Sequence, residues 1–239
     1  MTPPISIGGT DISGVTMDGT DVTEITVDGD TVFTAGLPDE DDLHARYDFS
    51  QATGTSTVND LSGNGHTLTG SYTGPTGSIN SKTAGVFDGV DDFLDNTFSS
   101  VSQPITMFLV ARLNDFATGG EKKMIDGASN AEMFIGSSIG SDWRVFAGSV
   151  MDNGAADADD HIFSILFDGS NSELRIDGTS EATGNVGSNS LNGLTIGAYG
   201  NVSNFTDMVA GEWLIYPQDK SAIFSNVESF LSGRWGISV

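Results

Sequence analysis

Nine Asp-Gly and Asn-Gly steps divide the chain into short apolar runs, and this spacing constrains its fold more than any other feature. Glycine, and to a lesser degree aspartate and asparagine, tolerates a positive φ angle, so these dipeptides favour tight turns. Residues 105–113 are nearly all apolar, and residues 161–167 lead through Asp168 and Gly169 into 173–177. The pattern predicts an all-β protein in which 105–113 is a central strand and 161–177 forms a hairpin.

Further strands are expected throughout the chain after residue 43, at 44–49, 66–70, 84–88, 92–95, 122–126, 132–136, 142–147, 193–199 and 208–216. One helix is expected at about 221–232, because Phe224, Val227 and Leu231 recur at helical spacing. Asp219 or Ser221 is expected to cap its start, and Gly233 to end it.

The length of 239 residues suffices for one large β-sandwich with a small appendage. The chain has no cysteine, which excludes structural disulfides and thiol-based metal or catalytic sites. No stretch reaches the roughly 18 apolar residues of a membrane span. The first residues also lack the basic and apolar regions of a secretion signal, so we expect no leader.

The charge balance is strongly acidic, with 33 acidic against 9 basic residues and a formal net charge of −24. Such a field repels phosphate backbones and anionic lipid, which disfavours nucleic-acid and membrane-surface binding. Disorder is not expected, because only 18% of the residues are charged and aromatic residues lie within regular apolar runs. Scarce lysine and abundant surface carboxylate are typical of salt-adapted proteins, since molar salt shortens the Debye length to about 3 Å.

Residues 5–33 contain a repeat with a period of ten, in which Gly9, Gly19 and Gly29 recur. Three such units bury little surface on their own, so residues 1–37 are expected to form a β-repeat arm for docking or oligomerisation. The alternative is a local β-meander lying on the sandwich. Residues 38–42 are expected to be an acidic linker, and residues 43–239 the sandwich. The repeat weakly resembles short glycine-punctuated repeats in the tail and virion proteins of tailed viruses.

Residues 43–239 resemble the laminin-G-like domains of the concanavalin A-like lectin and glucanase superfamily. Four passages carry this resemblance in the expected order, namely 47–66 with its Asp-Leu-Ser-Gly-Asn-Gly turn, 84–94 with Phe-Asp-Gly-Val-Asp-Asp, 105–113, and 211–217 followed by 231–236. The resemblance implies a jelly-roll β-sandwich closed by a C-terminal helix, and calcium is often bound at loops of this superfamily. It says little about the ligand, because the fold hosts many functions.

The loop residues predict one kind of metal site, a calcium site. Asp88, Asp91 and Asp92 place three carboxylates on one glycine loop, and Asp60 is expected nearby. Calcium takes six to eight oxygen ligands, and carboxylates supply them well. The alternative is that Asp88 and Asp91 only accept turn hydrogen bonds. No other cofactor is expected.

Sugar binding needs an exposed aromatic ring beside polar groups, and Trp143, Tyr72 and Tyr199 are the candidates. The alternative for all three is ordinary packing, as expected for Trp213 and Trp235.

Catalysis is not expected, and no catalytic residues are assigned. A retaining glycosidase needs two carboxylates about 5–5.5 Å apart, and the chain lacks the Glu-x-Asp-x-x-Glu pattern of catalytic members. The main acids in plausible strands stand apart, and they are Glu132, Glu173 with Asp177, and Glu212. There is no Gly-x-Ser-x-Gly elbow, and a solvated or structurally hydrogen-bonded role is favoured for His66 and His161.

These features together predict a virion surface protein of a tailed virus with a salt-loving host. It would be a capsid decoration or turret, or a tail fibre or baseplate component. The arm would assemble it as a homo-oligomer with other virion proteins, and the lectin-like domain would face host surface glycans. The alternatives are a free carbohydrate-binding module or cell-surface adhesin, which would be secreted or at the cell surface, and, third, a glycoside hydrolase.

Overall fold

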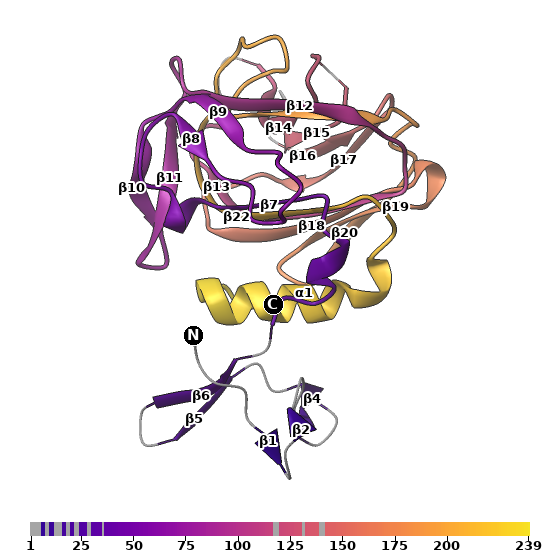
Figure 1. The fold of residues 1–239 in the computed structure, drawn as a ribbon. Helices are drawn as coiled ribbons and strands as arrows, with labels where there is room; N and C mark the ends of the chain where they lie inside the picture. The colour runs from indigo at the N-terminus through magenta and orange to yellow at the C-terminus, as the bar shows by residue number, and fades with distance from the viewer. Residues whose placement is uncertain are drawn as a thin grey trace.

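The computed structural model describes residues 36–116, 120–130, 132–138 and 142–239, together with six short strands within residues 6–34. Two eight-stranded antiparallel sheets face each other, and one C-terminal helix lies against the outer side of one of them (Figure 1). We call that sheet the helix-side sheet and the other the far sheet. The prediction of an all-β sandwich with a C-terminal helix is confirmed.

The helix-side sheet has the order β10 (Gly74–Ile79), β11 (Lys82–Asp88), β22 (Asp207–Tyr216), β13 (Ile105–Leu113), β18 (His161–Phe167), β19 (Ser172–Ile176) and β20 (Thr179–Gly184), with β7 (Ala45–Asp48) also paired to β22. The far sheet has the order β17 (Val150–Ala155), β16 (Asp142–Phe146), β15 (Phe134–Ser137), β14 (Lys122–Asp126), β21 (Leu191–Ile196), β12 (Phe93–Val101), β9 (Leu68–Ser71) and β8 (Thr57–Val58).

Strand β13 is apolar at every position except Thr106 and Arg112, because both of its faces are covered. Met107 and Leu109 point into the interior between the two sheets, while Phe108 and Val110 join a second apolar cluster beneath the helix. Alternate residues of a strand point to opposite faces, so a strand buried on both sides needs no polar positions. Each of these fully buried side chains contributes about 1.5–3 kcal/mol relative to exposure.

The α-helix of the described residues, α1 (Phe224–Trp235), follows a short 3-10 turn at Ser221–Ile223. It ends at Gly236, whose φ of 72° suits glycine, and not at Gly233 as the sequence predicted. The helix continues because Trp235 is buried in the apolar cluster that Phe224 also joins. Within the described residues, no helix combines the length and apolar character needed to cross a membrane.

The predicted acidic linker at 38–42 is anchored on the sandwich. Residues Glu40–Asp42 form a 3-10 turn, and Lys220 Nζ lies 2.5 Å from an Asp39 carboxylate oxygen and 2.6 Å from one of Asp42. The hydroxyl of Tyr216 donates to the Pro38 carbonyl at 2.9 Å. Residues 38–42 are therefore held on the sandwich, where Lys220 pairs with two of the four negative charges of the run.

The expected repeat arm contains three antiparallel strand pairs, β1 (Ser6–Ile7) with β2 (Thr10–Asp11), β3 (Thr16–Met17) with β4 (Thr20–Asp21), and β5 (Glu24–Val27) with β6 (Asp30–Thr34). In the part of the chain that is described, none of these strands pairs with either large sheet. Gly9, Gly19 and Gly29 of the repeat lie outside the described residues. The arm boundary at residue 37 stays a prediction.

A buried ion network joins the first and last parts of the sandwich. Glu212 in β22 is fully buried, and it pairs with Arg46 of β7 at 2.9 Å and with Arg234 of α1 at 2.7 Å. The indole N–H of Trp235 donates to the same carboxylate at 3.2 Å, and Arg234 also pairs with Asp48, which is buried as well. A carboxylate this deep is tolerated only because its oxygens are paired and hydrogen-bonded.

Replacing Glu212 by glutamine is expected to lower the free energy of unfolding by about 3 kcal/mol, because it leaves two partly buried guanidinium groups facing a neutral amide. Urea denaturation measures the change. The matched control is Glu173→Gln, since Glu173 is partly exposed and lies 3.5 Å from Arg175; its loss should stay below about 1 kcal/mol. Equal losses in the two variants would contradict this role for Glu212.

Candidate functional site

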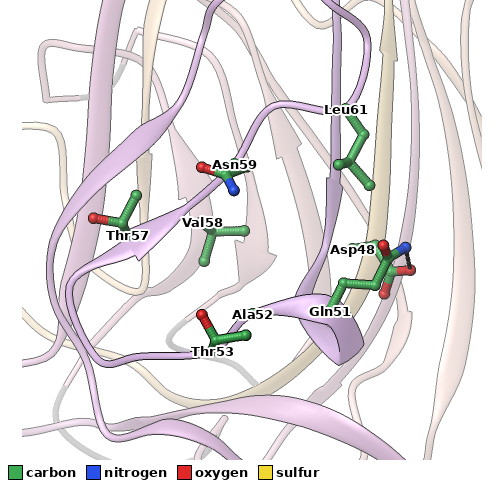
Figure 2. Close-up of a pocket in the computed structure, with 8 residues that line it drawn as sticks. All are labelled: Asp48, Gln51, Ala52, Thr53, Thr57, Val58, Asn59 and Leu61. Atoms are coloured by element: carbon green, nitrogen blue, oxygen red, sulfur yellow. Dashed lines mark hydrogen bonds between the residues drawn. The ribbon is translucent and has the colours of Figure 1, made fainter.

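One pocket lies beside β7 and β8 and has a volume of ≈ 310 Å³ (Figure 2). It is lined by Asp48, Gln51, Ala52, Thr53, Thr57, Val58, Asn59 and Leu61. Its charged residue is already engaged, because Asp48 accepts hydrogen bonds from the Ser50 hydroxyl at 2.6 Å and the Gln51 amide at 2.5 Å, besides its pairing with Arg234. This pocket therefore offers no free charged group to a ligand.

Asp60 lies in a separate turn and does not belong to the acidic group at 88–92. Its carboxylate accepts the backbone N–H groups of Arg46 at 3.0 Å, Ser62 at 2.9 Å and His66 at 2.9 Å. Burial alone would raise the pKa of Asp60, but these donors outweigh it and lower the pKa. The expectation that Asp60 joins a calcium site is corrected, since its oxygens hold the 60–66 turn against β7.

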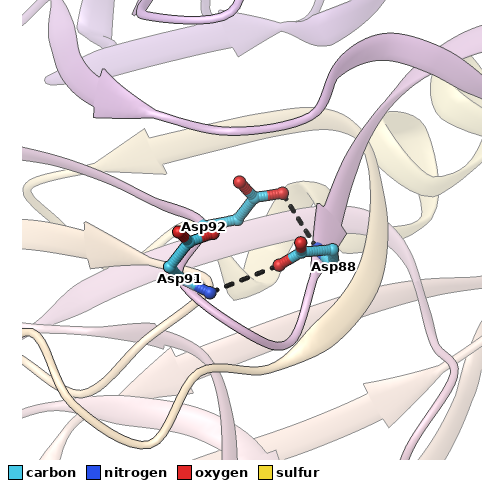
Figure 3. Close-up of side chains that lie close together, drawn as sticks. All are labelled: Asp88, Asp91 and Asp92. Carbon is cyan, nitrogen blue, oxygen red and sulfur yellow. Dashed lines mark hydrogen bonds between the residues drawn. The ribbon is translucent and has the colours of Figure 1, made fainter.

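Asp88, Asp91 and Asp92 do come together, on the loop between β11 and β12 (Figure 3). One oxygen from each lies within 4.8 Å of the others. Turn hydrogen bonds use part of the set: Asp92 accepts the Thr73 hydroxyl at 2.7 Å and the Asp88 N–H at 2.9 Å, and Asp88 accepts the Val90 N–H at 2.8 Å. Both alternatives therefore remain, and calcium binding stays a prediction.

None of the three candidate aromatic rings forms an open stacking platform. Tyr72 and Trp143 are only 2% and 3% exposed, so the expectation of exposed rings at these positions is wrong and the packing alternative holds. Tyr199 is half-buried, its ring lies 4.0 Å from the Lys123 ammonium, and its hydroxyl donates to the Glu121 carbonyl at 2.9 Å. One edge of the Trp143 ring nevertheless lines a second pocket.

That second pocket, which we call the edge pocket, lies where β16 and β17 of the far sheet approach the β18–β20 side of the helix-side sheet. It has a volume of ≈ 340 Å³. Its lining residues are Trp143, Gly154, Ala155, Asp157, His161, Ile176, Asp177, Thr179 and Glu181. The pocket therefore combines an indole, an imidazole and three carboxylates.

His161 is held between two of these carboxylates. Its Nδ1 lies 2.6 Å from an Asp177 oxygen and its Nε2 lies 2.8 Å from an Asp157 oxygen. Burial alone would lower the pKa of His161, but the two acids outweigh burial and raise the pKa to about 9. The imidazole is therefore charged at neutral pH, and both ring nitrogens donate.

Two other groups of the edge pocket remain unpaired. The indole N–H of Trp143 has no hydrogen-bond acceptor among the described residues, whereas Trp213 donates to Val110 at 3.2 Å and Trp235 to Glu212 at 3.2 Å. The carboxylate of Glu181 likewise has no hydrogen-bond donor among the described residues, and of the Glu181 oxygens only the backbone carbonyl accepts a hydrogen bond, from Asn153. The pocket can thus donate one hydrogen bond and accept several from a polar ligand.

The acids considered for glycoside hydrolysis lie elsewhere, apart from Asp177. Glu212 is locked in the buried ion network, Glu173 pairs with Arg175 at 3.5 Å, and Glu132 accepts the Ser129 N–H at 3.2 Å. Burial raises the pKa of Glu132, against the effect of that N–H donor. The sequence did not single out Glu181, because β20 lacks the apolar alternation that would have marked it as a strand.

Comparison with known proteins shows the fold. Matches among solved structures include Trypanosoma rangeli sialidase in complex with sialic acid, with 12% identity and a TM-score of 0.61 over 91% of this chain and 36% of that chain. Another is the botulinum neurotoxin serotype D binding domain, with 10% identity and a TM-score of 0.60 over 84% of this chain and 55% of that chain. The chain thus spans little more than a third of the sialidase and about half of the toxin domain.

These likenesses show that the chain shares its β-sandwich fold with part of each of these proteins. No protein-family model matches the sequence, and no curated protein matches it either.

The ion pairs of His161 predict a loss of stability in alkaline solution. The folded pKa of about 9 exceeds the ordinary 6.5, so the charged imidazole stabilises the fold fully below pH 6.5 and this contribution is lost as the pH rises through about 9. Between pH 6 and pH 10 the free energy of unfolding should fall by about 3 kcal/mol more in the wild type than in His161→Gln. Urea denaturation at each pH measures it, and parallel pH profiles would rule the prediction out.

Proposed function

We propose that the sandwich is a lectin-like binding domain whose edge pocket takes a carbohydrate unit. The observation that carries this proposal is the unpaired indole N–H of Trp143 in a pocket that also exposes the free carboxylate of Glu181. A sugar hydroxyl both donates and accepts, so one ligand can satisfy both groups. The volume of ≈ 340 Å³ lies in the lower part of the range of small-molecule pockets, about 300–1,000 Å³.

The structural neighbours support a binding role through their fold. One of them is a sialidase in complex with sialic acid, and another is the binding domain of a toxin. Because the identities are 10–12%, the likeness concerns the fold, and the ligand of this chain must be argued from its own residues.

We propose further that the domain does not hydrolyse its ligand. Asp157 and Asp177 are both tied to His161, and Glu212 is buried in ion pairs. Among the described residues that line the pocket, Glu181 is the one acid without a partner, and a glycosidase of the usual kind needs two carboxyl groups acting together.

The expected outcome on a glycan array at molar salt is binding by the full chain to a defined subset of glycans. Trp143→Phe should lower the signal at least about tenfold, because it removes the unpaired donor. Glu173→Gln, outside the pocket, is the matched control and should bind as the wild type does. Chromogenic glycosides incubated with the same preparation should remain intact. The absence of any glycan signal would overturn the proposal.

We propose in addition that the protein is part of a virion, and the N-terminal strand pairs support this role. A single two-stranded hairpin is marginally stable in water, so the pairs β1–β2, β3–β4 and β5–β6 need a surface to pack on. We propose that this surface belongs to neighbouring copies and to other virion proteins, so that the arm assembles the chain and the sandwich faces outward. The net charge of −24 suits a particle working at high salt.

Size measurement at molar salt tests the arm. The full chain should be an oligomer, and a chain lacking residues 1–35 should be a monomer with the same β-sheet circular dichroism. This truncation keeps Leu37, which is buried in the apolar cluster beneath the helix. If both chains are monomers, the arm does not drive assembly. If the chain is absent from purified particles, the virion role is excluded.

A further inference from the structure

We infer that the edge pocket selects a hexose that carries an ammonium group and rejects one that carries a carboxylate. This inference rests on the proposed carbohydrate-binding function and adds the class of sugar. Three features of the pocket support it: an unpaired indole N–H on a tryptophan that is otherwise buried, an opening beside a glycine, and a net negative lining.

The unpaired donor is the indole N–H of Trp143, which reaches the pocket from an otherwise buried side chain. The residue is 3% exposed, and its ring packs edge-to-face on Phe163 at 4.8 Å and on His161 at 5.8 Å. No described residue accepts its N–H, although the chain satisfies the N–H of its other two tryptophans. The indole nitrogen is not among the fully buried polar atoms that lack a partner, so it is open to solvent from the pocket. A ligand oxygen can therefore replace water as its acceptor.

The gap lies at Gly154 in β17, between the acid and the indole. A Cβ atom at this position would come to 3.8 Å from Glu181 Oε2 and 4.0 Å from Trp143 Cδ1. The Cδ1 atom is bonded to the indole nitrogen, so the N–H edge of Trp143 faces this opening. With φ at +66° the backbone also favours glycine. The glycine therefore keeps the space beside both unpaired groups free of a side chain of its own.

The charge of the lining decides between classes of sugar. Asp157, Asp177 and Glu181 supply three negative charges and His161 supplies one positive charge, which leaves −2. No described residue that lines the pocket is a lysine or an arginine. An ammonium group gains charge-assisted hydrogen bonds from such carboxylates, which are about twice as strong as neutral ones. A sugar carboxylate finds like charges within a few ångströms and no cation free to pair with it.

Isothermal titration of the full chain with methyl glycosides in the gluco- and galacto-series tests this selectivity at 0.15 M salt. Each series contains an amino sugar, the neutral hexose and the uronic acid. The amino sugar should bind at least about tenfold more tightly than the neutral hexose, a difference of one charge-assisted hydrogen bond, and the uronic acid should show no heat of binding. Raising the salt to 1 M should narrow the difference between amino and neutral sugars.

Glu181→Gln removes one negative charge at nearly constant volume. It should reduce the preference for the amino sugar to about twofold or less while the neutral hexose still binds. Gly154→Ala narrows the gap and should weaken all sugars, and circular dichroism verifies that it remains folded. Glu173→Gln on the neighbouring strand β19 is the matched control, and its isotherms should coincide with those of the wild type.

The outcomes separate this inference from the proposed function. If no sugar binds the wild type in either series or on the glycan array, the carbohydrate-binding function itself fails. If sugars bind but the neutral and amino forms are equal, or the uronic acid binds best, the selectivity fails while the function stands. If Glu181→Gln and Gly154→Ala leave every isotherm unchanged, the sugar binds elsewhere and the edge pocket is excluded.

Discussion

The whole molecule depends on one apolar interior shared by two facing sheets, and that interior must end at their edges. Strands at the centre, such as β13 and β18, are covered on both faces and carry few polar groups. At the edge formed by β17 and β20, the interior meets water. Trp143 stands on this boundary, with its rings in the core and its N–H edge in a polar pocket. The candidate site is thus a consequence of how the sandwich closes.

The central strands and the helix could be predicted because burial on both faces leaves a clear apolar pattern. The runs 105–113 and 161–167 coincide with β13 and β18. The edge strands β17 and β20 could not, since Val150–Ala155 and Thr179–Gly184 are largely polar and exposed on one side. The edge pocket is lined by these two strands together with residues of the predicted strands β16, β18 and β19, so about half of its lining had no signal in the sequence.

The chemistry of the site depends on register more than on spacing. Asp157 stands four residues before His161 and is visible in the sequence, but Asp177 reaches the other ring nitrogen only because β19 pairs beside β18, with Phe163 opposite Ile176. A hydrogen-bonded histidine was expected at 161, yet neither of its partners followed from the sequence. Trp143 was singled out as an exposed ring, whereas its contribution is a single unpaired N–H.

The most direct test of the account is the indole region of a ¹H–¹⁵N correlation spectrum recorded during titration with a methyl glycoside of an amino sugar. The chain has three tryptophans, and Trp143→Phe assigns the signal of residue 143. Binding of the sugar in the edge pocket should shift the Trp143 signal alone, because Trp213 and Trp235 already donate within the fold. A titration in which the sugar binds while the Trp143 signal stays fixed would contradict it.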